Sequence, residues 1–466
     1  MHPAGPARDD AAAAADGAGH APLTLRHAVA VIIGLTVGAG IFKAPSLVAA
    51  NVPSAGWMFA LWLAGGCISV VGALCYAELA STYPNRGGDY HFLSRAFGRH
   101  AALVYAWARF SVITTGSIAL LAFVFGDYLS QLLPLGRHGS ALYGALAVLL
   151  LTAINVRGLR DGVKAQTWLT VLELAGLALI LVAGLWPWTG GGAAPSPAAP
   201  SPAMAPSMPA IGLAMVFVLL TFGGWNDAAA ISAELRHRRS IAWALVLSVG
   251  FITLLYLLVN WAYWRTLGLG GMANSDAVAT DVLTAAFGPA AGKLIAAMVA
   301  VAALTSINAT LIVGARMASA LGHDWPQLRR LSDWDAARGV PRNSFVVQCV
   351  LALALIALGQ AFQNGFRAMV EYTAPVFWLF FLLTGLALFR LRRTDPARER
   401  PFRVPLYPVL PALFCLSSLY MLASSLSFVR SQELGGFNAA WVGVAVLASG
   451  MLFLWLVGRS ARRRSG

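Results

Sequence analysis

The chain has 466 residues, of which 58% are hydrophobic and only 11% are charged. A soluble domain is about 45–50% apolar and about 25% charged, so this composition, with a mean hydropathy of +0.70, indicates a membrane protein. The long polar stretches lie at the ends, which favours one membrane-embedded domain over several soluble ones. The net charge of +14 does not indicate a nucleic-acid partner, because the basic residues fall in alternate loops.

Both ends of the chain are predicted to be tails outside a membrane domain of residues 23–459. Residues 1–22 are rich in Ala, Gly and Pro and lack the features of a signal peptide, which predicts a disordered cytoplasmic tail. Residues 460–466 form a second, basic tail. Within the domain, runs of about 20 mainly apolar residues predict twelve spans. They cover residues 25–50, 57–81, 102–133, 140–156, 164–187, 209–234, 240–267, 285–317, 344–362, 366–391, 405–429 and 438–458.

The basic residues also predict the orientation of the spans. If the N-terminus lies in the cytoplasm, few Lys and Arg residues remain in the loops on the outer side. The positive-inside rule therefore predicts that both ends are cytoplasmic, in a multi-pass protein of the bacterial cytoplasmic (inner) membrane. The outer basic residues are Arg137, Arg265, Lys293, Arg367 and Arg430.

Two spans carry glycines at mid-depth. The first contains three glycines within residues 34–40, and the sixth contains the pair Gly223-Gly224. Glycine destabilises a helix interior by about 1 kcal/mol relative to alanine, so each helix is expected to open there. Paired interruptions in two halves of a chain are typical of transporters built from inverted repeats, with a binding site at the midplane. The alternative is that these glycines only let helices pack closely.

An opened helix exposes amides at one end and carbonyls at the other. Amides at a helix N-terminus suit a carboxylate, and free carbonyls suit an ammonium group. A zwitterionic α-amino acid has both groups, so the two breaks together favour an amino-acid site.

Four stretches carry a resemblance to a known family, and they run in order along residues 25–459. These stretches resemble the amino acid–polyamine–organocation superfamily, and most of all its L-type amino acid transporter branch. They are Gly38-Ala39-Gly40-Ile41-Phe42, Gly72 to Leu79 with Gly87-Gly88-Asp89-Tyr90, Phe222 to Asn226 with Glu234-Leu235, and Arg400 to Pro408.

The resemblance implies an all-α fold of twelve transmembrane helices with helices 1 and 6 discontinuous. It implies a leucine-transporter-like arrangement in which residues 25–187 and 209–391 are five-helix inverted repeats and residues 405–458 add two helices. It also implies that amides near Ala39 and Gly40 bind the substrate carboxylate, while carbonyls near Thr36, Leu220 and Gly223 bind its amine. The implied substrate-binding set is Thr36, Gly38, Ala39, Gly40, Leu220, Phe222, Gly223, Gly224 and Trp225.

Three positions depart from the family pattern. Ala39 stands where serine is usual, which removes a hydroxyl but keeps the amide. Leu220 stands where a bulky aromatic is common, which predicts a thinner gate or a wider pocket. Glu173 in span five stands near a position that is a lysine in many relatives. Phe222 and Trp225 are expected either to shape the pocket or its gate, or simply to pack between helices.

Arg109 and Glu173 are charged residues predicted to lie within spans three and five. A lone charge in mid-membrane costs about 3 kcal/mol or more, so we predict that the two form an ion pair. The pair would clip the two spans together, or Glu173 would exchange a proton during transport. In span eight, Ser306 and Asn308 are expected either near a cation position against span one or as bonds between helices.

Asp227 and Glu371 are further acidic residues within predicted spans. We expect Asp227 to cap the inner half of helix 6 and face the pathway, and Glu371 to have a local hydrogen-bonding role.

Secondary active transport of amino acids, by exchange or proton coupling, is the function that the resemblance implies. A polyamine or cationic amino-acid antiporter and a non-transporting sensor of the same fold stay open as alternatives. The sequence has no HExxH, GxSxG or clustered His/Cys pattern, so we expect no enzyme activity, metal or cofactor. Relatives in eukaryotes carry a disulfide-linked heavy chain through a cysteine between spans three and four. Residues 133–140 contain no cysteine, so no covalently linked heavy chain is expected.

Overall fold

The computed structural model describes residues 24–85, 87–157, 162–186, 206–235, 239–333, 340–361, 364–431 and 441–452. These residues are mostly helical and contain no strand, which confirms the predicted polytopic all-α class. The tails predicted at residues 1–22 and 460–466 lie outside the described residues.

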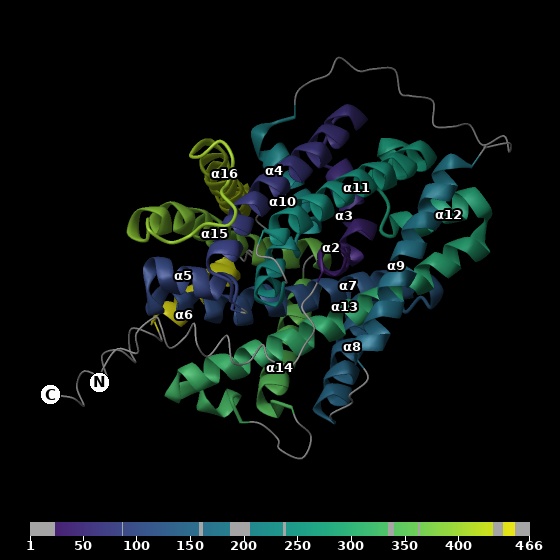
Figure 1. Cartoon of the computed structure of the whole chain (residues 1–466). Helices are drawn as coiled ribbons and strands as arrows, with labels where there is room; N and C mark the ends of the chain where they lie inside the picture. Colours follow the sequence, from purple (N-terminus) through teal and green to yellow (C-terminus); the bar gives the residue numbers. More distant parts are fainter. Residues whose placement is uncertain are drawn as a thin grey trace.

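Among the described residues, eight helical segments are long and apolar enough to cross a membrane (Figure 1). One of them is continuous from Arg99 to Leu132 and comprises α6 (Arg99–Ala108), the π-helical η2 (Arg109–Thr114) and α7 (Thr115–Leu132). The others belong to α4 (Ala55–Thr82), α8 (Gly139–Val156), α11 (Ser240–Ala273), α13 (Pro289–Asp324), α14 (Arg342–Gln360), α15 (Gly365–Thr394) and α16 (Val409–Ser431).

The other four predicted spans take shorter or divided forms. The first divides into α2 (Leu25–Thr36), η1 (Ala39–Phe42) and α3 (Ala44–Ala49). The sixth divides into α10 (Met208–Thr221) and η3 (Trp225–Glu234). The fifth corresponds to α9 (Gly162–Leu185), and of the twelfth only residues 441–452 are described. The discontinuity of helices 1 and 6 is thus present, whereas the full layout of twelve spans stays a prediction.

Two short helices were not predicted, α5 (Asp89–Phe97) and α12 (Val278–Phe287). The predicted start of span eight at residue 285 is wrong, because Gly288 adopts φ 86° and separates α12 from α13. Pro289 then begins α13, at the position where its missing N–H costs nothing. Both short helices have fewer apolar residues in sequence than a span needs, so a search for spans passes over them.

Two groups of helices can be distinguished by their packing (Figure 1). In one group α11 packs on α2 and α4, and α10 packs on α4. In the other, α7, α8, α13 and α14 pack against one another. Each group combines helices from residues 25–157 with helices from residues 208–360, which is the pairing that an inverted repeat would produce.

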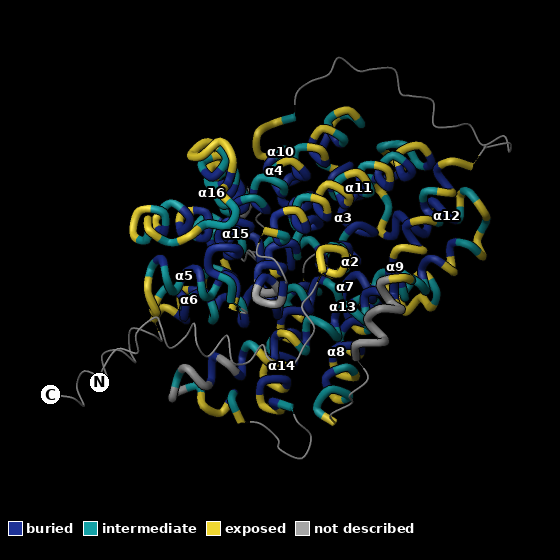
Figure 2. The backbone as a smooth tube through the Cα atoms, in the orientation of Figure 1, coloured by how far each residue is buried: buried dark blue, intermediate teal, exposed yellow. Residues whose placement is uncertain are grey.

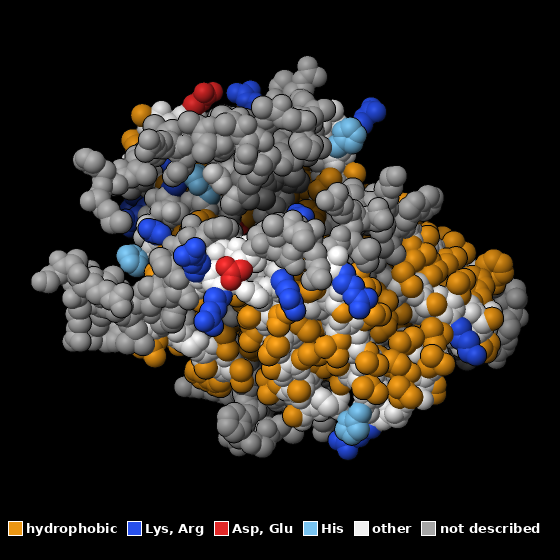
Figure 3. Space-filling model, turned by 90° about the horizontal axis from the view of Figure 1, so that it is seen from below, with side chains coloured by type: hydrophobic (Ala, Val, Ile, Leu, Met, Phe, Trp, Pro, Cys, Tyr) orange, Lys and Arg blue, Asp and Glu red, His pale blue; other side chains and the backbone are white. Residues whose placement is uncertain are grey.

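Burial separates the centre of this assembly from its outer faces. Buried residues lie on the helix faces turned toward the centre, and exposed residues follow the outer faces (Figure 2). Many exposed side chains are large and apolar, such as Leu150, Trp243 and Val350. Figure 3 shows hydrophobic side chains over a broad area of one face, with Lys and Arg side chains near its border. This surface is the one expected of a protein solvated by lipid.

A buried carboxylate joins two of the stretches that carry the family resemblance. Glu78, near the end of α4, is only 1% exposed. Its carboxylate accepts two hydrogen bonds from the Arg392 guanidinium, one of them from Nε at 2.7 Å. It also accepts the Val404 N–H at 2.7 Å, and Arg400 Nε lies 3.6 Å away. The loop before α16 is therefore fixed to α4 by a neutralised and hydrogen-bonded charge.

Candidate functional site

The first helix opens at the predicted glycines. α2 ends at Thr36, and Gly38 has an extended backbone with φ −143° and ψ −177°. The next hydrogen bond joins Ile41 N to Gly38 O at 3.4 Å, where η1 begins. The leading amides of a helical segment have no partner within it, and in η1 these are the amides of Ala39 and Gly40. Their binding to a carboxylate stays a prediction.

The second helix opens after Thr221, and Gly224 forms the turn. Gly224 has φ +115°, a conformation that residues with a side chain rarely adopt. A Cβ at this position would also lie 2.3 Å from the carbonyl oxygen of Leu35 in α2. Gly224 is therefore needed twice, for its backbone conformation and for the close contact between the two opened helices.

The two breaks meet around Tyr256 of α11. The Tyr256 hydroxyl lies 3.3 Å from the carbonyl oxygen of Thr36 and 3.2 Å from that of Thr221. A Cβ at Gly40 would meet the Thr221 side chain at 3.6 Å, so the breaks also touch directly. Sequence reasoning did not find Tyr256, although a tyrosine in an apolar run was a visible signal. The hydroxyl of Thr36 is buried and has no hydrogen-bond partner among the residues that the structure describes.

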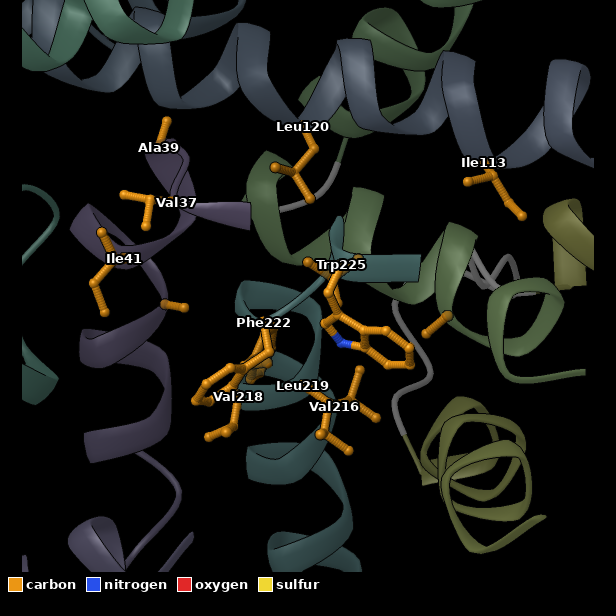
Figure 4. Close-up of a cluster of buried hydrophobic side chains, with 14 of the residues drawn as sticks. Val37, Ala39, Ile41, Ile113, Leu120, Val216, Val218, Leu219, Phe222 and Trp225 are labelled. Carbon is orange, nitrogen blue, oxygen red and sulfur yellow. The ribbon is translucent and has the colours of Figure 1, made fainter. Parts of the chain in front are cut away.

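A cluster of buried hydrophobic side chains includes residues from both breaks (Figure 4). Val37, Ala39 and Ile41 come from the first break, and Leu120 and Ile113 come from α7 and η2.

Both aromatic residues of the second break are buried among other rings. Phe222 packs on Trp62 and Tyr256, with ring centroids 6.1 and 5.1 Å away. Trp225 packs on Tyr76 and Phe381 at 5.2 and 5.6 Å. Helix packing, one of the two expectations for this pair, is what the structure displays; a gating role stays a prediction.

The predicted ion pair between Arg109 and Glu173 is wrong, because Arg109 pairs with Asp227 instead. Its Nη2 atom lies 2.7 Å from Oδ1 of Asp227, at the start of η3. Its Nη1 atom donates to the Tyr105 hydroxyl at 3.3 Å. Distance along the sequence does not show whether Glu173 or Asp227 is the partner of Arg109. The turn at Gly224 brings Asp227 to η2.

Glu173 is buried in α9, with 8% of its surface exposed, and no hydrogen bond or ion pair joins it to any part of the chain that the structure describes. Gly176, one turn further along α9, faces α13 and the first break, since a Cβ there would meet Ile295 at 3.2 Å and Phe42 at 3.9 Å. Glu173 therefore has no counter-charge among the described residues and lies on a helix that approaches Phe42 of the first break.

Three other polar predictions have specific outcomes. Asn308 accepts a hydrogen bond from Asn155 of α8 at 2.6 Å, which is the predicted alternative of a bond between helices. Ser306 contributes its carbonyl to Thr310 within α13. Glu371 accepts a hydrogen bond from Arg367 at 2.9 Å within α15, as expected. A cation position at Ser306 or Asn308 stays a prediction.

On the other side of the first break, Lys43 forms an ion pair that the sequence analysis missed. Its Nζ atom lies 2.8 Å from Asp127 in α7 and 2.6 Å from the carbonyl oxygen of Asp276 before α12. Tyr128 adds a hydrogen bond of 2.6 Å to the Phe42 carbonyl. These contacts join the segment after the first break to α7 and to the residues before α12, and the Lys43 side chain is only 3% exposed.

Known proteins resemble the chain along most of its length. A family model described as amino acid permease matches residues 23–457. The b(0,+)-type amino acid transporter 1 of Homo sapiens is 28% identical, covering 93% of this chain and 87% of that protein. The serine/threonine exchanger SteT of Bacillus subtilis is 26% identical, with 86% and 90% covered. The large neutral amino acids transporter small subunit 2 of Homo sapiens is 28% identical, with 89% and 78% covered.

Proposed function

This chain belongs to the amino acid permease family, and from that premise we propose that it exchanges neutral amino acids across a bacterial cytoplasmic membrane. Its membership of the L-type branch of the amino acid–polyamine–organocation superfamily agrees with the relatives above. Its activity is amino acid transport, and exchange is the mode that the name of the bacterial relative states.

The observation that carries the proposal is the junction of the two helix breaks. The amides of Ala39 and Gly40 would bind the substrate carboxylate, and the carbonyls near Thr36 and Thr221 would bind its ammonium group. A substrate that holds both breaks in place would couple the movement of α2 and η3, which is the requirement of alternating access. In the orientation that we propose, with the N-terminus in the cytoplasm, the α3 side would face outward, and the buried Lys43–Asp127 ion pair would lie on that side.

A proton-coupled mode is the second candidate, and the carboxyl of Glu173 supports it. An ionised carboxyl that lacks a partner in a buried position is costly, and binding a proton removes that cost. If the environment of Glu173 changes as the first helix moves, proton uptake and release would follow the transport cycle. We also propose that the chain works without a disulfide-linked heavy chain, because residues 133–140 contain no cysteine.

The test is uptake of radiolabelled amino acids into proteoliposomes that contain the purified protein. Exchange predicts that uptake of a neutral amino acid rises severalfold when the vesicles are preloaded with substrate. Uptake that requires a pH gradient, and ignores the internal substrate, would replace exchange by proton symport. The absence of uptake for every amino acid in the panel would contradict the proposal.

Matched glycine variants connect this assay to the site. Gly224→Ala should abolish uptake, because it opposes the positive φ and the contact with Leu35. Gly250→Ala in α11 is the control, since a Cβ there would meet no atom within 4 Å. Equal uptake by the two variants would show that the Gly224 turn is not needed for transport.

A further inference from the structure

An ion pair adjoins the second break on the side away from Lys43. Asp227 is the third residue of η3, and Arg109 begins the π-helical segment η2. Besides the Arg109 guanidinium, the same Asp227 oxygen accepts a hydrogen bond from the Asn226 amide at 3.1 Å. Asn226 in turn accepts the Gly224 N–H at 3.3 Å. The pair is thus connected through two hydrogen bonds to the turn that opens the helix.

The two members of the pair differ in their exposure. The Asp227 side chain is 42% exposed and that of Arg109 is 14% exposed. The carboxylate therefore borders solvent-accessible space next to the binding site, and Arg109 approaches it from the packed side. A substrate side chain near this point would meet a negative charge whose field Arg109 largely cancels.

Arg109 also faces a second acid further from the break. Its Nη1 atom bonds the Tyr105 hydroxyl, which donates to Asp89 of α5 at 3.2 Å. Asp89 is buried and also accepts a hydrogen bond from Thr384 of α15. With both acids ionised, this cluster carries one positive and two negative charges, so the charge of Arg109 decides its net effect on a substrate.

We propose that the Arg109–Asp227 pair sets the charge preference of the transporter, with Arg109 preventing Asp227 from selecting cationic substrates. The inference rests on the proposed transport of neutral amino acids and names the residues that restrict it to them. Loss of the Arg109 charge leaves a negative site suited to lysine-like substrates. Loss of the Asp227 charge leaves Arg109 positive and favours glutamate-like substrates, to a smaller extent because Asp89 remains.

The experiment compares substrates that differ in charge but little in shape. Lysine is compared with norleucine, and glutamate with glutamine, as inhibitors of labelled neutral amino acid uptake in proteoliposomes. For Arg109→Gln we expect the inhibition constant of lysine, relative to norleucine, to fall about tenfold or more. For Asp227→Asn we expect the ratio for glutamate against glutamine to fall about threefold. Arg109→Gln/Asp227→Asn should return both ratios to those of the parent chain.

Several outcomes separate this proposal from the one on which it rests. Equal changes for lysine and norleucine in Arg109→Gln, or parental ratios in both single variants, would overturn it. If Arg109→Gln does not fold, Asp227→Asn tests the opposite direction, with Arg109→Lys as the variant that keeps the charge and the parental preference. Absence of neutral amino acid uptake by the parent chain would instead contradict the proposed function.

Discussion

Glu78 and Glu173 are both buried carboxylates within the helical core, but they differ in the number of charged and hydrogen-bonding partners around them. Glu78 accepts hydrogen bonds from Arg392 and from the Val404 amide. Glu173 has no such partner among the residues that the structure describes. A buried charge that is neutralised and hydrogen-bonded stabilises one arrangement of the chain. A buried acid without partners adds no such stabilisation and is instead a candidate for a functional role. This difference indicates that Glu78 anchors the loop before α16, whereas Glu173 is a candidate for proton coupling.

The largest expected effect comes from Glu78→Gln. The amide would leave Arg392 and Arg400 without the charge that balances them, at a cost of about 3–5 kcal/mol. Thermal unfolding in detergent, monitored by size-exclusion chromatography, should show a clearly lower Tm than the parent chain. A Tm equal to that of the parent would mean that Glu78 does not anchor the loop.

Asp89→Asn should change the dependence of stability on pH. Burial raises the pKa of Asp89 to about 6, against the opposing effects of hydrogen bonds and of Arg109. A raised pKa means that stability from this group is complete at low pH and is lost as pH rises from about 4 through about 6, by about 1.4 kcal/mol per pH unit.

The asparagine cannot ionise, so the variant avoids this loss. Its stability relative to the parent should therefore be higher at pH 7.5 than at pH 5. Measuring Tm for both chains at the two pH values tests this expectation. Parallel pH profiles would refute it.

Glu173→Gln is expected to leave stability within about 1 kcal/mol of the parent, because no partner loses a bond. Its effect should instead appear in transport. If Glu173 exchanges protons, uptake driven by a pH gradient should disappear in Glu173→Gln and persist in Glu173→Asp. Unchanged proton dependence in Glu173→Gln would eliminate the coupling role, and a large drop in Tm would give Glu173 a structural role like that of Glu78.

The smallest effect is expected for Glu371→Gln. Its bond to Arg367 spans one helical turn, and the Arg367 side chain is 29% exposed, so its charge is not buried when the bond is lost. The expected loss is below about 1 kcal/mol, within the range of local ion pairs. A loss as large as that of Glu78→Gln would show that burial, rather than the number of partners, decides these costs.

The sequence predicted the features that depend on local chemistry. Runs of apolar residues located the eight long helices, and clustered glycines located both breaks, because glycine lacks the side chain that would fill the turn. The family motifs indicated Glu78 and Arg400 as members of separate stretches, but not that they meet.

Features that depend on three-dimensional contact were not predictable in this way. Choosing Glu173 as the partner of Arg109 was wrong, because the choice among acids depends on the rotation of helices that only packing determines. Tyr256 and Lys43 escaped notice for the same reason, since each acquires its role from residues far away in the chain. Asp89 was named only as part of a family motif, without its contact to Tyr105.

Tyr256 carries one hydroxyl proton and lies between two carbonyl oxygens. It can donate to only one of them at a time, so a bond to the other carbonyl needs a different donor. An ammonium group brings three donors and would complete both acceptors at once. Under the binding that we propose, the ammonium group of the amino acid would bond both carbonyl oxygens, which the single proton of Tyr256 cannot do.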